Sequence, residues 1–256
     1  MSRSPATRVA APLAVALLAL PLTVLVAQAF ADVWRAPGVL PDELGWRGFE
    51  LAFERAGAGE ALLNSVVIGL LATALALVVG WPAARVLGQR LLPRNGLVFL
   101  LLALPLLMPP YLAGFGLTEW FIRLGLVDSL AGIVLAHLTF VLPYAIVILL
   151  SGFTARVDEL EEMARVAGAG WLARLRLVTV PSLRPTIAAA ALLAFLVSWS
   201  QYGTTLAVGA GRPTLPIVML PFVRTDPQVA AALALVFLAP CLLALALATR
   251  AQRSPL

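Results

Sequence analysis

The chain has 256 residues, of which 61% are hydrophobic and 12% are charged, and its formal net charge is +5. Soluble domains carry about 45–50% apolar and about 25% charged residues, so this composition excludes an ordinary soluble domain and indicates an integral membrane protein. Every basic residue is an arginine, and the arginines lie in short segments between apolar runs, a distribution typical of membrane topology and not of nucleic-acid binding.

Six apolar runs are long enough to cross a bilayer, which takes about 17–25 residues each. They cover 9–31, 61–84, 97–117, 130–153, 186–206 and 229–249. Prolines interrupt several runs, and bundled membrane helices tolerate such kinks because neighbouring groups satisfy the freed carbonyls. The pattern predicts an all-α membrane protein with six transmembrane helices in one domain, residues 1–256.

The first run raises the alternative of a cleaved secretory signal, since Ala27-Gln28-Ala29 resembles a cleavage site. Its apolar stretch is longer than the usual ~7–15 residues of a signal, so we expect an uncleaved helix. Residues 32–60 then form an outer loop with a short helix around Gly48–Ala56.

Arginine distribution sets the expected orientation. With the N-terminus inside, 12 of the 18 arginines lie on the inner side, and nine of the 13 acidic residues lie on the outer side. Positive charge favours the cytoplasmic side. We therefore expect cytoplasmic N- and C-termini, with the charged segment 154–185 also in the cytoplasm.

Several functional classes are disfavoured. A P-loop ATPase needs a lysine, and the sequence has none. No charged residue falls inside the six runs, which disfavours an ion-driven carrier. His137 and Cys241 are the only residues of their types, so a metal cluster is not expected. An intramembrane protease using His137 with Ser198 or Ser200 lacks a glycine-flanked nucleophile turn.

The charged segment reads as two short helices joined by a turn. Asp158 and Glu161 have the spacing of an N-cap with its reciprocal glutamate. Glycine at 168 and 170 favours the end of the first helix, and Trp171–Leu177 then fits a second, interfacial helix. Pro181 and Pro185 lie where the next span begins. The first helix has one predicted apolar stripe, made of Val157, Leu160, Ala164 and Ala167.

The spacing within this segment resembles a known family. Glu162-Met163-Ala164, three residues, Gly168, nine residues and Val178-Thr179-Val180-Pro181 are similar to the E-A-A-x3-G-x9-I-x-L-P signature of ATP-binding-cassette (ABC) importer permeases. Met163 and the two valines depart mildly from it. The resemblance covers about residues 60–250 and includes Leu62-Leu63-Asn64-Ser65 at the start of the second run.

The resemblance implies a type I (MetI-like) permease bundle with a cytoplasmic coupling helix, in the bacterial inner membrane. Glu162, Met163, Ala164 and Gly168 would shape an element that docks on an ATPase, and Pro181 would start the helix that transmits its motion. The implied partners are two ABC ATPase subunits, which bind ATP and Mg, a second permease copy or a sister permease, a periplasmic or extracellular substrate-binding protein, and lipid. No cofactor is expected in this chain. The alternatives are an exporter-type or ion-driven carrier and, after these, an intramembrane enzyme.

A polar band in the fifth run has two interpretations. Trp199, Ser200, Gln201 and Tyr202 form a possible substrate path, but such residues also serve as hydrogen-bonding glue between helices, which we favour. The general pattern of the spans, with Ala136-His137 and Leu142-Pro143-Tyr144, is similar to the branch handling iron, thiamine, polyamines and related small solutes. A thiamine-like solute is weakly favoured, because Trp199 and Tyr202 could stack on a ring.

Overall fold

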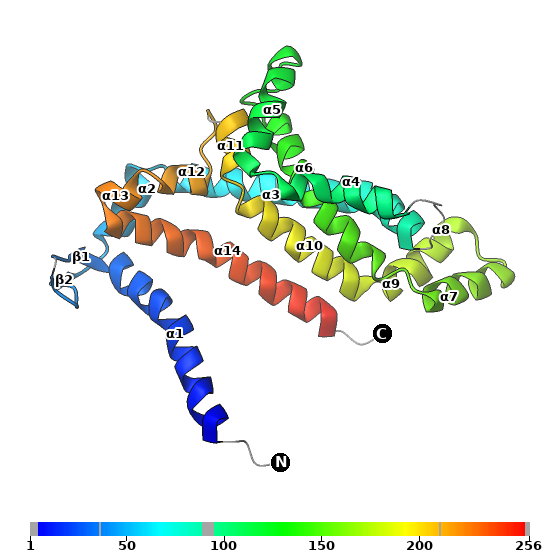
Figure 1. The fold of residues 1–256 in the computed structure, drawn as a ribbon, viewed down its shortest axis with the longest axis horizontal. Coiled ribbons are helices and arrows are strands. Elements are labelled where there is room, and N and C mark those ends of the chain that lie inside the picture. The colour runs from blue at the N-terminus through cyan, green and yellow to red at the C-terminus, as the bar shows by residue number, and fades with distance from the viewer. Residues whose placement is uncertain (1–4, 36, 89–94, 210, 254–256) are drawn as a thin grey trace. The chain divides into compact units, whose positions relative to one another are not determined.

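The computed structural model describes residues 5–35, 37–88, 95–209 and 211–253, which are mostly helical (Figure 1). This confirms the predicted all-α class. The chain forms two compact units, Met1–Leu62 with Thr214–Ala239 and Leu63–Pro213 with Pro240–Leu256.

The first unit combines the start of the chain with a later segment. Its elements are α1 (Pro5–Ala29), β1 (Ala31–Val33), β2 (Glu43–Leu44), α2 (Arg47–Glu54), α12 (Leu215–Met219), α13 (Phe222–Thr225) and the first part of α14 (Pro227–Arg253). The strands pair antiparallel, with Ala31 opposite Leu44. The helix predicted around 48–56 is confirmed as α2.

Close backbone packing and one ion pair hold α2 in this unit. A Cβ on Gly48 would lie 2.9 Å from the carbonyl oxygen of Gln228 and 3.1 Å from that of Ala29, so only glycine fits there. Arg47 donates to the carboxylate of Asp226 at 2.6 Å, and this hydrogen bond raises the pKa of Arg47 above its ordinary value. The ion pair thereby joins the two parts of the first unit, which are 179 residues apart at Arg47 and Asp226.

The second unit holds the longer helices. Its elements are α3 (Ala58–Gly88, from residue 63), α4 (Asn95–Leu107), α5 (Pro110–Arg123), α6 (Leu130–Leu150), α7 (Ala155–Val166), α8 (Trp171–Arg174), the π-helical turn η1 (Leu175–Thr179), α9 (Val180–Ser182), α10 (Arg184–Trp199), α11 (Gly203–Val208) and the end of α14. Helix α6 packs along α10, and α5 packs along α11 (Figure 1). A core cluster that includes Ala84, Leu149, Phe153, Val157 and Leu183 joins the end of α3 to the segment after α6.

Within the described residues, three helices are long and apolar enough to cross a membrane, and five if each of two bent pairs counts as one span. The three are Ala58–Gly88, Leu130–Leu150 and Pro227–Ala251, which match the predicted second, fourth and sixth spans. The described apolar part of α1 is shorter, Ala19–Ala29. The count of six spans therefore stays a prediction.

The third and fifth predicted spans are not continuous helices. In place of one helix over 97–117, the chain bends by 99° between Gly96–Leu107 and Pro110–Arg123. Pro109 is extended (φ −56°, ψ 130°), because a following proline disfavours helical geometry. The second bent pair is Trp171–Ser182 with Arg184–Trp199, at 72°. In addition, in place of one helix over 186–206, α10 ends at Trp199 and α11 starts at Gly203. His137 of α6 bonds to Ser198 before this gap and to Thr205 after it, which makes the break tolerable.

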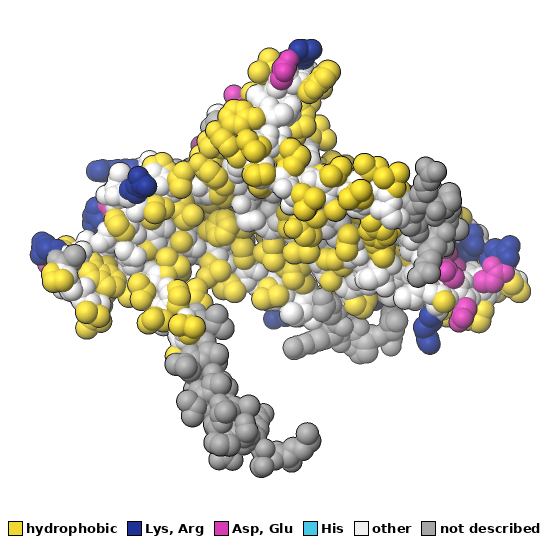
Figure 2. All heavy atoms as spheres, viewed as in Figure 1, with side chains coloured by type: hydrophobic (Ala, Val, Ile, Leu, Met, Phe, Trp, Pro, Cys, Tyr) yellow, Lys and Arg dark blue, Asp and Glu magenta, His cyan; other side chains and the backbone are white. Residues whose placement is uncertain are grey.

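Hydrophobic side chains cover much of the face seen in Figure 2, over α4 and its neighbours, whereas acidic and basic side chains gather over α7. A surface of this kind fits a bundle facing lipid, with the charged segment outside the hydrocarbon region.

Candidate functional site

The charged segment forms the helical hairpin α7–α9. Helix α7 begins at Ala155 after Thr154, so the prediction that Asp158 is the N-cap is wrong by one turn. Glu161 does not reach back to cap the helix, because it has partners elsewhere in the fold. Asp158 lies in the first turn, where a negative charge is favourable at the positive end of the helix dipole.

Gly168 ends α7 as predicted. Its φ of +82° lies in the left-handed region, which glycine adopts at no steric cost. The chain then resumes as α8, η1 and α9 rather than as one regular helix. Pro185 lies in the first turn of α10, where a missing N–H costs nothing. Pro181 lies near the end of the helical run Trp171–Ser182, which is bent by 72° from α10.

One face of α7 is exposed and carries two of the predicted coupling residues, Glu162 and Met163, together with Val166. Met163 is 61% exposed and Val166 78% exposed. Glu162 is exposed and accepts from Arg165, at 2.9 Å from Nε and 2.5 Å from Nη2. These bonds hold the pKa of Glu162 below its ordinary value, and the positive charge of Arg165 and Arg174 lowers it further. The face therefore presents apolar side chains beside an ion pair that is charged at neutral pH.

The other face of α7 is buried and is not wholly apolar. Val157 is buried as predicted, Leu160 and Ala164 are half-buried, and Ala167 is exposed, so the predicted stripe is wrong at its end. Glu161, which is only 8% exposed, takes a buried place on this face. It accepts a hydrogen bond from Arg85 near the end of α3 and another from Thr179 in η1.

Sequence reasoning missed this cluster of Glu161, Arg85 and Thr179. A usable signal was present, because Glu161 follows Val157 by four residues and must share its face on a helix. The partners, 76 and 18 residues away along the chain, carried no such signal.

The second candidate site surrounds the gap between α10 and α11. His137 on α6 lies 2.9 Å from Ser198 Oγ through Nδ1 and 2.7 Å from Thr205 Oγ1 through Nε2. Thr205 gives its only hydroxyl proton to the carbonyl of Gln201 at 2.8 Å, so it must accept from Nε2–H. Ser198 therefore donates to Nδ1, and His137 is an interhelical hydrogen-bonding residue.

The four predicted path residues differ in exposure. Ser200 is exposed and Tyr202 is half-buried, whereas Gln201 is buried and pairs with Thr204 at 3.0 Å. Trp199 is 2% exposed and stacks on Phe195 with ring centroids 5.4 Å apart. In this conformation only Ser200 and Tyr202 offer surface to a solute.

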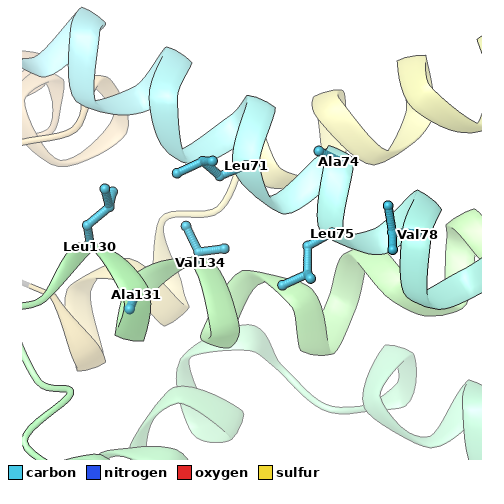
Figure 3. A pocket seen from close by; sticks show the side chains of 7 residues that line it. All are labelled: Leu71, Ala74, Leu75, Val78, Leu130, Ala131 and Val134. Atoms are coloured by element: carbon cyan, nitrogen blue, oxygen red, sulfur yellow. The ribbon is translucent and has the colours of Figure 1, made fainter.

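A groove of about 470 Å³ lies between α3 and α6 (Figure 3). Its lining is wholly apolar: Leu71, Ala74, Leu75, Val78, Leu130, Ala131 and Val134. Sites for polar solutes need a few placed hydrogen-bonding groups, which this lining does not offer.

The family model for the binding-protein-dependent transport system inner membrane component matches residues 76–254. The chain belongs to this family. The match contains the whole hairpin α7–α9 and both broken spans, and the family's members named below are transport permeases. The expectation that the chain is a permease subunit of an ABC importer, and not an enzyme, is confirmed.

Three curated relatives bear this out. A putative ABC transporter permease of Streptomyces antibioticus is 34% identical over 68% of this chain and 77% of the relative. A diacetylchitobiose uptake permease of Streptomyces coelicolor is 29% identical over 71% of this chain and 60% of the relative. A thiamine transport permease of Brucella suis is 30% identical over 61% of this chain, but the match spans only 32% of that protein.

A solved structure supports the fold. The chain superposes on a bacterial ABC transporter chain from a system that imports alginate, an acidic polysaccharide, with a TM-score of 0.75 and 15% identity. The match covers 98% of this permease and 99% of the other chain. At this identity the comparison supports the importer-permease fold and nothing finer.

Proposed function

We propose that the permease forms half of a transmembrane pathway and that the exposed face of α7 docks on a separate ATPase subunit. Two ATPase subunits, which bind ATP and Mg, would act on a pair of permeases, either two copies of this chain or this chain with a sister permease. A substrate-binding protein would deliver the solute from outside. The termini and the hairpin α7–α9 would lie in the cytoplasm.

The observation that carries the docking role is the apolar surface of α7. Met163 and Val166 are three residues apart, so they share a helix face, and both are largely exposed. Amphipathic helices bind partners by laying such a face into an apolar groove. The ion pair of Glu162 and Arg165 lies at its edge, as charged groups do at the rim of an interface.

The test reverses the charge of Glu162. We expect Glu162→Lys to remain in the membrane but to lose copurification of the ATPase, because it breaks the pair with Arg165 and puts positive charge on the docking face. Glu119→Lys is the matched control, since Glu119 pairs with Arg123 at 2.5 Å on the exposed surface of another helix. Normal copurification and transport in Glu162→Lys would overturn the docking role.

For the substrate we propose a short oligosaccharide over thiamine. The relative that takes up diacetylchitobiose is matched over 60% of its length, and the thiamine permease over 32%. The buried stacking of Trp199 on Phe195 also weakens the proposed ring-binding role of Trp199. Ser200 and Tyr202 are the better candidates to line the path, with Gln201 behind them.

Uptake into proteoliposomes of the assembled complex tests this assignment. We expect radiolabelled diacetylchitobiose to accumulate with ATP and thiamine not to accumulate. Tyr202→Ala should lower the uptake more than Trp199→Ala does, at equal abundance in the membrane. Uptake of thiamine alone would reverse the choice of substrate, and unchanged uptake in the double variant Trp199→Ala, Tyr202→Ala would remove both from the path.

A further inference from the structure

The buried face of α7 carries a charge in a place where charge is costly. Glu161 is 8% exposed and lies on the same face as Val157, which is packed into the core cluster of the second unit. A buried carboxylate is tolerated only when it is paired and hydrogen-bonded. Its partners therefore determine what Glu161 does.

Those partners come from two other elements and occupy both carboxylate oxygens. The guanidinium of Arg85, three residues before the end of α3, donates to Oε2, and the hydroxyl of Thr179, the last residue of η1, donates to Oε1. Thr179 is 1% exposed, and Arg85 has 33% of its side chain exposed. One carboxylate thus joins three segments of the chain.

Apolar contacts surround this ionic contact on the α3 side. Ala84 and Leu87, which flank Arg85, belong to the same core cluster as Val157 and Leu183, the residue just after α9. The end of α3, the helix α7 and the turn before α10 therefore pack as one patch. The docking residues Glu162, Met163 and Val166 are exposed on α7, whereas Glu161 is buried, so this helix is suited to receive a force on one face and to pass it on from the other.

We propose that Glu161, Arg85 and Thr179 form a latch that carries the motion of the α7–α9 hairpin into α3. This rests on the proposed docking of the ATPase on α7. Without the latch, only apolar contacts, among them those of Ala84 and Leu87, join the hairpin to α3. With the latch, the long helix α3 moves together with the hairpin. The three are positioning residues, and none of them touches nucleotide or solute.

Two reporter positions separate movement of the hairpin from movement of α3. Cys241 is the only native cysteine, so Cys241→Ala gives a clean background. Ala155→Cys at the exposed start of α7 reports on the hairpin, and Val78→Cys, 72% exposed on α3, reports on the helix. Each is labelled with a nitroxide or an environment-sensitive dye in the complex with its ATPase, and the probe of closure is AMP-PNP with Mg.

The latch is weakened without a change of size. Thr179→Val removes the hydroxyl, Thr179→Ser keeps it, and Glu161→Gln removes the charge. We expect both reporters to respond to AMP-PNP in the parent and in Thr179→Ser. In Thr179→Val and Glu161→Gln the Ala155 reporter should still respond, while the response at Val78 should be lost.

If the ion pair were purely stabilising, its loss would lower the melting temperature but leave the two reporters responding together. Equal responses at both positions in Glu161→Gln and Thr179→Val would therefore overturn the latch. Failure of the Ala155 reporter to respond in the parent complex would instead overturn the docking of the ATPase on α7, and the latch with it. Loss of the Val78 response in the variants, with the Ala155 response kept, supports both the docking on α7 and the latch.

Discussion

His137 donates its Nε2 hydrogen to Thr205, with 2.7 Å between Nε2 and Oγ1, and thereby ties α6 to the start of α11. Its other nitrogen accepts from Ser198 near the end of α10. The histidine bridges both sides of the gap at 200–202, so the fifth predicted span is broken in its helix but held together by side chains.

Removing this bridge should cost a measurable amount of stability. Polar pairs between membrane helices contribute about 0.6 kcal/mol on average and up to about 1.7 kcal/mol in double-mutant cycles. We expect a coupling of that size between His137→Ala and Thr205→Val, measured by reversible unfolding in detergent. Leu135→Ala, at a half-exposed position on the same helix, should combine additively with Thr205→Val. If His137→Ala also combines additively with Thr205→Val, the hydrogen bond between the two residues contributes nothing to the free energy of unfolding.

The packing of α5 against α11 depends on Gly114. A Cβ on Gly114 would lie 2.7 Å from the Cβ of Ala207 and 3.2 Å from the Cα of Thr204. Neither atom belongs to the end of a flexible side chain, so neither can move away easily. Gly114→Ala should therefore lower the free energy of unfolding by about 1–3 kcal/mol through overpacking. Gly116→Ala in the same helix meets nothing within 4 Å and should be neutral or stabilise by up to about 1 kcal/mol. Thermal unfolding of the two variants side by side checks this, and equal melting temperatures would contradict it.

The turn after α7 depends on a left-handed backbone at Gly168. An alanine there costs roughly 1–2 kcal/mol, because its Cβ crowds the backbone at φ +82°. We expect Gly168→Ala to fray the end of α7, to increase proteolysis of the hairpin and to weaken copurification of the ATPase. Gly170→Ala is the control, since Gly170 has φ −64° and open space around it. If both variants are cleaved alike, the conformation at 168 is not what shapes the hairpin.

Labelling from each side of the membrane tests the predicted orientation. In the Cys241→Ala background, Ala155→Cys should react with an impermeant maleimide only in inside-out vesicles. Val39→Cys, 86% exposed in the loop between β1 and β2, should react only in right-side-out cells. The expectation follows from the arginine excess on the inner side. Reaction of Ala155→Cys from outside would place the hairpin beyond the reach of any cytosolic ATPase.

Several features were determined by sequence alone. Apolar runs of sufficient length, arginine-rich connections and the spacing from Glu162 to Pro181 indicated a helical membrane permease and the position of its charged hairpin. Gly168 and Pro185 marked helix boundaries correctly, because left-handed turns and first helical turns depend on a few neighbouring residues. These features depend on composition and on local backbone geometry within short stretches of sequence, so the sequence alone is enough to predict them.

Other features were decided only by tertiary structure. Glu161 fits a capping motif locally, yet it is buried against Arg85 and Thr179, because a buried carboxylate gains more from two distant donors than from a frayed helix end. Trp199 was a possible path residue, with a role between helices favoured, and the fold packs it on Phe195. The fifth run reads as continuous, yet it breaks where His137 supplies partners from another helix. Each of these outcomes depends on residues far apart in the chain, whose proximity is set by packing and leaves no periodic trace in the sequence.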